Sequence, residues 1–396
     1  MMQISPETQL FIREHSSDDV RVLALQAKKY PDIDMPTVIT QIAGRKVAAE
    51  KIPSWWEIEK IWYPKHLSLE QCSSEITARY KARLLQGDSL TDLTGGFGID
   101  CSFLATGFKS ATYVERQEEL CEIAAHNFPV LNLNHINIKN EDGVTYLQAM
   151  SPVDCLFLDP ARRNEHGGKT VAISDCEPNV AELEELLLQK ANRVMIKLSP
   201  MLDLSLALKE LKQTQEVHIL SVNNECKELL ILLGQTSPTE ISSHCVNLST
   251  KGTQEEQHFV FTREQEQCSE CTYTDSLETY LYEPNASLLK AGAFRSIAAA
   301  YPVRKLHPNS HLYTSDTFIE NFPGRIFRIV NQCSFNKKEV KENLADLKKA
   351  NVTVRNFPAT VAELRKRIHL AEGGDTYLFA STLNNGQKVL IRCEKV

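Results

Sequence analysis

The chain has 396 residues, of which 42% are apolar and 24% charged, and its net charge at neutral pH is −7. This length and composition are ordinary for a globular protein of two or three domains. The opening segment has no basic region followed by an apolar run, and no stretch of about eighteen apolar residues occurs. These features exclude a membrane-spanning protein, and we expect the chain to be cytoplasmic.

Eleven cysteines are scattered without the regular spacing of a disulfide framework. We expect them to be reduced thiols, most of them packed within apolar segments. Cys268 and Cys271 form a Cys-x-x-Cys pair, but no second pair follows at the spacing of a zinc site. We therefore expect no structural metal.

The charge is unevenly distributed along the chain. Residues 281–396 contain 18 Lys and Arg against 10 Asp and Glu, a balance of +8. Residues 1–280 contain 26 Lys and Arg against 41 Asp and Glu, a balance of −15. A basic C-terminal third points to a polyanionic partner, and a solvated basic face that binds nothing is the other interpretation.

Residues 1–83 are predicted to form an N-terminal helical domain. Ser17 and Asp18 are placed to cap a short helix, and a second helix is predicted from Pro36 to about Glu50. An aromatic cluster follows, and its expected role is packing between these helices and the next domain. The cluster consists of Trp55, Trp56, Trp62 and Tyr63.

A glycine-rich turn lies near the start of the next segment, residues 84–235. A short apolar run ends at Asp92, a helix is predicted from Ile99, and between them stand Thr94, Gly95, Gly96 and Gly98. Glycine permits positive φ angles and lets a ligand approach the backbone, and the amides of the helix start offer donors to an anionic group. The sequence does not match the dinucleotide-binding pattern Gly-x-Gly-x-x-Gly. Counted from Gly96, the third glycine of that pattern would fall at Cys101.

Short apolar runs alternate with helical patterns from Ser89 to about Leu233, which predicts βαβ units and a parallel sheet. Seven strands fit: one ending at residue 92, and others at 111–115, 135–139, 153–158, 193–198, 217–222 and 229–233. Ligands bind beyond the carboxyl ends of such strands. A single acidic residue at a strand end is often only a turn residue. Here an acidic residue stands at the end of each of four successive strands, which predicts a ligand pocket formed by Asp92, Glu115, Asp142 and Asp159.

Asp92 ends the first predicted strand, and Thr-Gly-Gly-x-Gly follows it from Thr94 to Gly98. This pattern resembles motif I of the class I S-adenosylmethionine-dependent methyltransferases. The resemblance implies an α/β fold with a Rossmann-like seven-stranded methyltransferase sheet, and S-adenosylmethionine as cofactor. Glu115, followed by Arg116, would accept from the ribose hydroxyls, and Asp142, followed by Gly143, from the adenine amino group. In this class the segment before the first strand often covers the methionine end of the cofactor. That implies contacts from Gln71, Ser73 and Thr77, with Ser74 as a plain helix cap being the alternative.

Asp159 and Pro160 stand where base-methylating enzymes of this class carry an Asp/Asn-Pro-Pro-aromatic motif. Ala161 and Arg162 depart from that pattern, so a stacking platform must be a guanidinium or come from elsewhere. We expect Asp159 to orient the nucleophile and accept its proton during an in-line methyl transfer. Four cations on this side are predicted to contact substrate phosphate, with structural pairing to acids as the alternative: Arg162, Arg163, Lys169 and Lys197.

Residues 236–280 are predicted to be a connecting region with a little sheet, and residues 281–396 to form an α+β region with one helix from Pro284 to about Ala300. The segments Tyr282-Glu-Pro-Asn and Gly-Gly-Asp-Thr-Tyr, which ends at Tyr377, resemble a ferredoxin-like and THUMP-like module found behind a Rossmann methyltransferase domain in a bacterial family. True THUMP modules bind RNA. The resemblance therefore implies RNA contacts from basic residues of this region: Lys290, Arg295, Arg304, Lys305, Arg365, Lys366 and Arg367. The last three otherwise form a solvated face.

The preferred hypothesis is a methyltransferase that acts on a base nitrogen in structured RNA, either transfer or ribosomal. Two alternatives stay open. One is methylation of a protein or a small molecule, and the other is a non-catalytic RNA-binding protein that retains the fold.

Overall fold

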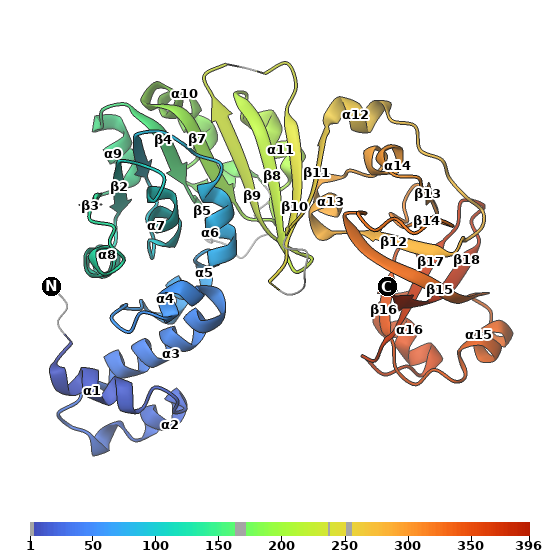
Figure 1. Cartoon of the computed structure of the whole chain (residues 1–396), viewed down its shortest axis with the longest axis horizontal. Helices are drawn as coiled ribbons and strands as arrows, with labels where there is room; N and C mark the ends of the chain where they lie inside the picture. The colour runs from blue at the N-terminus through green and yellow to red at the C-terminus, as the bar shows by residue number, and fades with distance from the viewer. Residues whose placement is uncertain (1–3, 163–171, 237, 251–255) are drawn as a thin grey trace. The chain divides into compact units, whose positions relative to one another are not determined.

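The computed structural model describes residues 4–162, 172–236, 238–250 and 256–396 (Figure 1). The chain divides into two compact units. The first comprises Met1–Gln215 and Leu229–Pro238, and the second comprises Glu216–Glu228 and Thr239–Val396. Among the described helices, none combines the length and apolar character that a membrane span requires.

The first unit begins with a series of helices. Asp19 caps α2, in place of the predicted Ser17 or Asp18, because its carboxylate accepts from Arg21 N at 2.8 Å. Asp34 caps α3, accepting from the amide of the third residue of that helix at 3.2 Å. The helices are α1 (Pro6–Glu14), α2 (Val20–Leu25), α3 (Met35–Lys51), α4 (Pro53–Trp56), α5 (His66–Gln71) and α6 (Glu75–Ala82), with a 3-10 turn at Ala27–Lys29.

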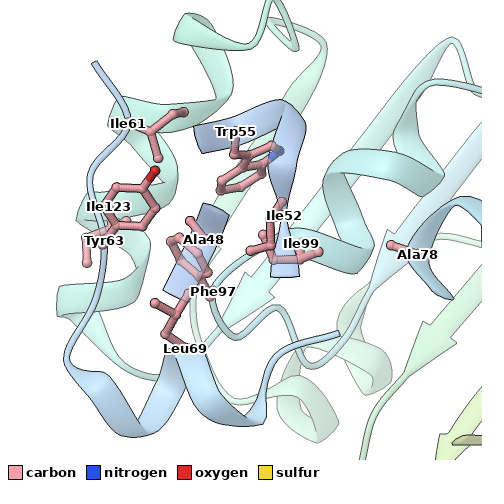
Figure 2. Close-up of a cluster of buried hydrophobic side chains, with 10 residues drawn as sticks. All are labelled: Ala48, Ile52, Trp55, Ile61, Tyr63, Leu69, Ala78, Phe97, Ile99 and Ile123. Atoms are coloured by element: carbon pink, nitrogen blue, oxygen red, sulfur yellow. The ribbon is translucent and has the colours of Figure 1, made fainter. Parts of the chain in front are cut away.

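Two of the predicted core aromatics pack the helices against the glycine-rich turn (Figure 2). Trp55 and Tyr63 are only 2% and 3% exposed. Phe97, which belongs to the turn, meets Trp55 edge-on with ring centroids 5.2 Å apart. The other two aromatics, Trp56 and Trp62, lie nearer the surface. Burial of Phe97 in this cluster therefore holds the glycine-rich turn against the helical segment.

The sheet of the first unit has the strand order β3-β2-β1-β4-β7-β9. Neighbours are parallel except β7 and β9, which are antiparallel. β8 (Thr214–Val222) starts beside the end of β9, where Gly234 N donates to Gln213 O. The predicted parallel-rich methyltransferase sheet is thus confirmed, with β1 (Ser89–Asp92), β2 (Ser110–Glu115), β3 (Ile136–Asn140), β4 (Val153–Leu158), β7 (Ala191–Leu198) and β9 (Glu225–Gly234).

Helices connect the parallel strands, as βαβ units require. They are α7 (Ile99–Ala105), α8 (Glu118–Val130), α9 (Gly143–Ala149), α10 (Val180–Lys190) and α11 (Leu204–Glu210). After β4 the chain makes a short antiparallel ribbon from β5 (Ala161–Arg162) and β6 (Cys176–Glu177). A 3-10 turn, Ile173–Asp175, directly precedes β6.

The second unit contains more sheet between residues 236 and 280 than the sequence predicted. β10 (Ser242–Leu248) runs parallel to residues 216–222 of β8, and β11 (Glu256–Thr262) runs antiparallel to β10. The predicted strand at 258–261 lies within β11. Helix α12 (Arg263–Cys268) follows it directly.

The rest of the second unit is a seven-stranded sheet of order β13-β14-β12-β15-β18-β17-β16 with helices, which confirms the predicted α+β region. The helix predicted from Pro284 to Ala300 is wrong as one element, because Gly292 adopts a left-handed φ of 79° and ends α13. The elements are β12 (Tyr280–Pro284), α13 (Ala286–Ala291), α14 (Ser296–Ala300), β13 (Arg304–Lys305), β14 (Tyr313–Ser315), β15 (Gly324–Ser334), α15 (Lys337–Leu344), β16 (Asn351–Val354), α16 (Val361–Ile368), β17 (Thr376–Thr382) and β18 (Lys388–Lys395).

Candidate functional site

Acidic residues gather at the carboxyl ends of neighbouring strands in the first unit. Asp92 ends β1, Glu115 ends β2, and Asp159 directly follows β4. Because β4, β1 and β2 are parallel neighbours, these ends lie at the same edge of the sheet. β3 is the next strand along, and Asp142 follows it. This edge is where an open parallel sheet binds ligands.

The carboxyl group of Asp92 is buried, and one of its oxygens has no hydrogen-bond donor among the described residues. It is 1% exposed, and its Oδ1 accepts from Thr94 N at 3.0 Å. Among the described residues, none donates to its buried Oδ2. Burial raises the pKa of Asp92 to about 8, although the Thr94 amide works in the opposite direction. A buried acceptor usually has a donor, so this oxygen offers a position for a donor from outside the described residues.

The glycines of the turn serve different purposes. A Cβ on Gly95 would stand 2.2 Å from the ring of Tyr113, so this glycine is required by packing. Gly96 has a φ of +55°, and the nearest atom that its Cβ would meet is Thr94 O at 3.8 Å. Gly98 has a φ of +85° and directly precedes α7. The space beside Gly96 is therefore open, as a turn that admits a ligand requires.

Glu115 is held in place by backbone amides. Its Oε2 accepts from Gly96 N at 2.9 Å and its Oε1 accepts from Gln117 N at 2.8 Å. These two bonds fix the carboxylate beside the glycine turn. A carboxylate has about four acceptor positions, so both oxygens keep capacity for further donors.

Asp142 and Arg116 lie on the exposed part of this edge. Asp142 caps α9, with its Oδ1 accepting from Val144 N at 3.0 Å. Gly143 is required there by close approach, because a Cβ on it would stand 2.2 Å from a backbone oxygen of the chain. The guanidinium of Arg116 lies 3.5 Å from Oε1 of Glu177 in β6.

A buried charge network, which the sequence did not predict, lies beside the acids. Nζ of Lys81 is 3.0 Å from Oδ1 of Asp100, and Nζ of Lys197 is 3.1 Å from Oδ2 of the same carboxylate. The hydroxyl of Ser73 donates to Asp100 at 2.7 Å and accepts from both lysines. Burial opposes the ionised Asp100, but Lys197 and Lys81 outweigh it and lower the pKa of Asp100 below its ordinary range.

Lys197 joins this network to Asp159. Its Nζ lies 2.6 Å from Oδ2 of Asp159, whose side chain is 38% exposed. Desolvation raises the pKa of Asp159, while Lys197 works in the opposite direction. The backbone amide of Asp159 donates to Thr94 Oγ1 at 2.6 Å, which connects this residue to the glycine turn. Lys197 is thus a buried ion-pair partner, which agrees with structural pairing, the alternative to the predicted phosphate contact.

The other predicted site residues occupy varied positions. Thr77 is buried and its hydroxyl donates to Ser74 O at 3.0 Å, while Gln71 is exposed at the end of α5. Pro160 is buried behind Asp159. The backbone of Arg162 lies in β5, but its side chain and the whole of Arg163 and Lys169 lie outside the described residues.

Three of the predicted RNA contacts lie on α16 of the second unit. Of the others, Lys290 lies in α13, Arg295 just before α14, and Arg304 and the buried Lys305 in β13. Lys366 and Arg367 are exposed, and the guanidinium of Arg367 lies 4.9 Å from the ring centre of Phe335. Arg365 is only 17% exposed and its guanidinium lies 3.8 Å from Glu372. Two of the three cations are therefore accessible to a partner.

The donors and acceptors of the first unit fit S-adenosylmethionine. That molecule offers a cationic amino group, two ribose hydroxyls and an adenine amino group, all of which donate hydrogen bonds. The buried Oδ2 of Asp92, the fixed carboxylate of Glu115 and the exposed carboxylate of Asp142 are acceptors. Gly96, beside which space is open, donates its backbone amide to Glu115.

A sheet of this order, with an antiparallel strand beside β7 and acids around a glycine turn after β1, is the fold of the class I methyltransferases. The cofactor of that class is S-adenosylmethionine. The second unit adds the C-terminal part: a ferredoxin-like domain model matches residues 280–323, and a THUMP domain-like model matches residues 324–395. No curated protein matches the chain.

Among solved structures, a candidate methyltransferase from Porphyromonas gingivalis W83 is 34% identical to the chain, covers 100% of both chains and has a TM-score of 0.87. The chain therefore belongs to the same family as that protein. An rRNA methylase from Streptococcus thermophilus matches at 14% identity and a TM-score of 0.30, over 40% of this chain and 93% of its own. A Streptococcus mutans protein crystallised with S-adenosylhomocysteine matches at 14% identity and a TM-score of 0.30, over 40% of this chain and 96% of its own.

Proposed function

We propose that the protein transfers a methyl group from S-adenosylmethionine to a base nitrogen in structured RNA. The observation that carries the first part is the buried Oδ2 of Asp92, which has no donor among the described residues, at the end of the strand that leads into the glycine turn. A buried acceptor without a donor costs free energy, and a cationic amino group placed there removes that cost. In this proposal residues 84–235 carry the chemistry and residues 281–396 bind the substrate.

The cofactor-binding roles follow the chemistry of each side chain. Asp92 accepts from the amino group, Glu115 from the ribose hydroxyls and Asp142 from the adenine amino group, while Gly96 admits the ligand to the backbone. Ser73 and Lys81 position Asp100 and Lys197 behind this surface. When bound, the cofactor supplies an electrophilic methyl group on a sulfonium. Further cofactor contacts are proposed for Gln71, Thr77, Thr94, Gly95, Gly98, Arg116 and Gly143.

Asp159 is the proposed catalytic residue. Its carboxyl is partly exposed at the same strand ends, and Lys197 holds its Oδ2. Burial raises the pKa of Asp159, and the adjacent ammonium opposes that rise. The ionised carboxylate is the form that orients an N–H group and accepts its proton. Positioning is sufficient for the methyl transfer itself, so no covalent intermediate with the protein is needed.

RNA is the proposed substrate because the C-terminal third has a balance of +8 and its last part matches a THUMP domain-like model. The contacts proposed on α16 come from Lys366 and Arg367, with Arg365 beside them; Arg162 and Arg163 are proposed to contact phosphate near Asp159. Fold likeness does not establish a substrate, so this part of the proposal requires its own test.

Two measurements test the two parts separately. Calorimetry should detect S-adenosylmethionine binding to the wild-type chain and a loss of at least about tenfold in affinity in Glu115→Gln. The control is Asp88→Asn, which removes an exposed acid paired with Lys109 at the other end of β1. Labelled cofactor should then methylate total RNA from cells that lack the gene. No cofactor binding would favour a non-catalytic protein, and labelling of protein in place of RNA would overturn the substrate class.

A further inference from the structure

Three histidines and a glutamate meet on neighbouring strands of the second unit. Glu216 and His218 are two residues apart on β8, so both side chains lie on one face of the sheet. His244 of β10 is the register partner of His218 in the parallel pairing. His258 lies on β11, which pairs with β10 on its other side. Strand register, not loop conformation, therefore brings these side chains together.

The ligand atoms are close enough to share one cation. Nε2 of His218 lies 3.3 Å from Oε2 of Glu216, and Nε2 of His244 lies 4.0 Å from the same oxygen. One ligand atom from each of the three residues lies within 4.8 Å of the others. Zinc–ligand bonds of about 2.0–2.2 Å in a tetrahedron place ligand atoms roughly 3.3 Å apart. Small rotations of the three side chains would bring their ligand atoms to this spacing.

His258 supports the arrangement from the other side of His244. Its Nε2 lies 3.2 Å from Nδ1 of His244, so the second ring nitrogen of His244 has a hydrogen-bond partner. Metal-binding histidines usually have such a partner, which fixes the tautomer and the orientation of the ring.

We propose that Glu216, His218 and His244 bind one divalent transition metal ion, with His258 as a positioning residue. Two imidazoles and a carboxylate suit zinc and its neighbours, whereas magnesium and calcium prefer oxygen ligands alone. The side chains of His218, His244 and Glu216 are 3%, 19% and 33% exposed, so the site opens to solvent on the glutamate side and leaves a position for water. Bound metal would join β8 to β10. The proposal uses no residue of the candidate methyltransferase site and does not depend on it.

The test uses the full chain after treatment with a chelator. Titration with Zn²⁺ by calorimetry should show one ion per chain, and Co²⁺ should give a visible absorption band without the charge-transfer band of a thiolate. Glu216→Gln and His244→Gln should weaken binding at least about tenfold, and His258→Phe by about 10–100-fold. Glu225→Gln, an exposed acid of the same unit, and the double variant Cys268→Ser/Cys271→Ser should bind as the wild type does.

Each other outcome overturns the proposal. Absence of a bound ion would do so, as would wild-type affinity in Glu216→Gln and His244→Gln. A thiolate band that disappears in the cysteine variant would assign the metal to Cys268 and Cys271 instead. Because His218 is almost fully buried, the partly exposed Glu216 and His244 are the variants of choice, and circular dichroism checks that they fold.

Discussion

Nζ of Lys197 lies 2.6 Å from Oδ2 of Asp159, and the same ammonium lies 3.1 Å from Asp100. One buried cation therefore serves two carboxylates, and Lys81 supplies the second cation of the network. Contact between Lys197 and a substrate phosphate would require both ion pairs to break. The geometry favours a positioning role toward Asp159 over a phosphate contact.

Lys197→Met is expected to destabilise the protein by about 3–5 kcal/mol, because it leaves two carboxylates with a single buried cation. Urea unfolding measures the change. Lys209→Met, which removes an exposed lysine of α11, is the control and should stay within about 0.5 kcal/mol of the wild type. Equal stabilities of the two variants would show that the ion pairs of Lys197 contribute nothing to the fold.

The raised pKa of Asp92 predicts how the free energy of unfolding depends on pH. Its pKa is raised to about 8 by burial in the folded chain, whereas an unfolded aspartate titrates near about 3.9. Between these values the folded chain retains a proton that the unfolded chain has released, so the free energy of unfolding falls as the pH rises. Below the unfolded pKa both states are protonated and the effect vanishes.

Asp92→Asn removes that titration. The variant should match the wild type near about pH 4 and exceed it in stability by up to about 5 kcal/mol near about pH 8.5. Denaturant unfolding at both pH values provides the comparison, with Asp88→Asn as the exposed control. A constant difference between wild type and Asp92→Asn across the pH range would contradict the raised pKa.

The same carboxyl should couple cofactor binding to proton release. At about pH 7 most of the free protein has Asp92 protonated, and a cationic amino group beside Oδ2 favours the ionised form. Binding of S-adenosylmethionine should therefore release about one proton per chain. Calorimetry in buffers of different ionisation enthalpy counts that proton, and its persistence in Asp92→Asn would assign it to another group.

Two neighbouring glycines offer a matched pair of variants. Gly95→Ala places a Cβ 2.2 Å from the buried ring of Tyr113, so it should cost about 3 kcal/mol or more of stability. Gly96→Ala meets nothing closer than 3.8 Å and should cost only about 1–2 kcal/mol for its left-handed φ. We expect Gly96→Ala to fold and yet to lose cofactor affinity. Wild-type affinity in that variant would place the ligand elsewhere.

The fold was predictable because its signals are local. Strand-ending acids, a glycine turn and alternating apolar runs specify a parallel sheet without knowledge of any distant contact. The network of Lys81 and Asp100 was missed for the opposite reason. Asp100 is the only charged residue of α7, whereas Lys81 shares α6 with Glu75 and Arg79. Only the packing of α6 against α7 shows that Lys81 and Asp100 meet.

The histidine cluster was hidden in a similar way. Its members stand at positions 218, 244 and 258, and they meet only because β10 pairs with β8 in one register and with β11 in another. The sequence predicted residues 236–280 as a connection with little sheet, so no register was available. A strand register is set by long-range packing, which apolar periodicity does not specify.

RNA binding by α16 is the remaining test. Lys366 and Arg367 are exposed and carry no described ion pair, whereas Arg365 is held near Glu372 at 3.8 Å. Lys366→Gln/Arg367→Gln should therefore weaken RNA binding without a change in stability. If both residues bind phosphate, the slope of log affinity against log salt concentration should fall by about 0.7–0.9 for each phosphate that the variant no longer neutralises.

The matched control is Lys337→Gln/Lys338→Gln, which removes two exposed lysines of α15 in the same unit. It changes the net charge equally, so it separates a local contact from general attraction between a basic domain and a polyanion. Equal reductions of affinity in the two double variants would indicate that only net charge matters. An unchanged slope in Lys366→Gln/Arg367→Gln would remove α16 from the RNA interface and leave the substrate proposal to rest on the charge balance of the C-terminal third and the THUMP-like match.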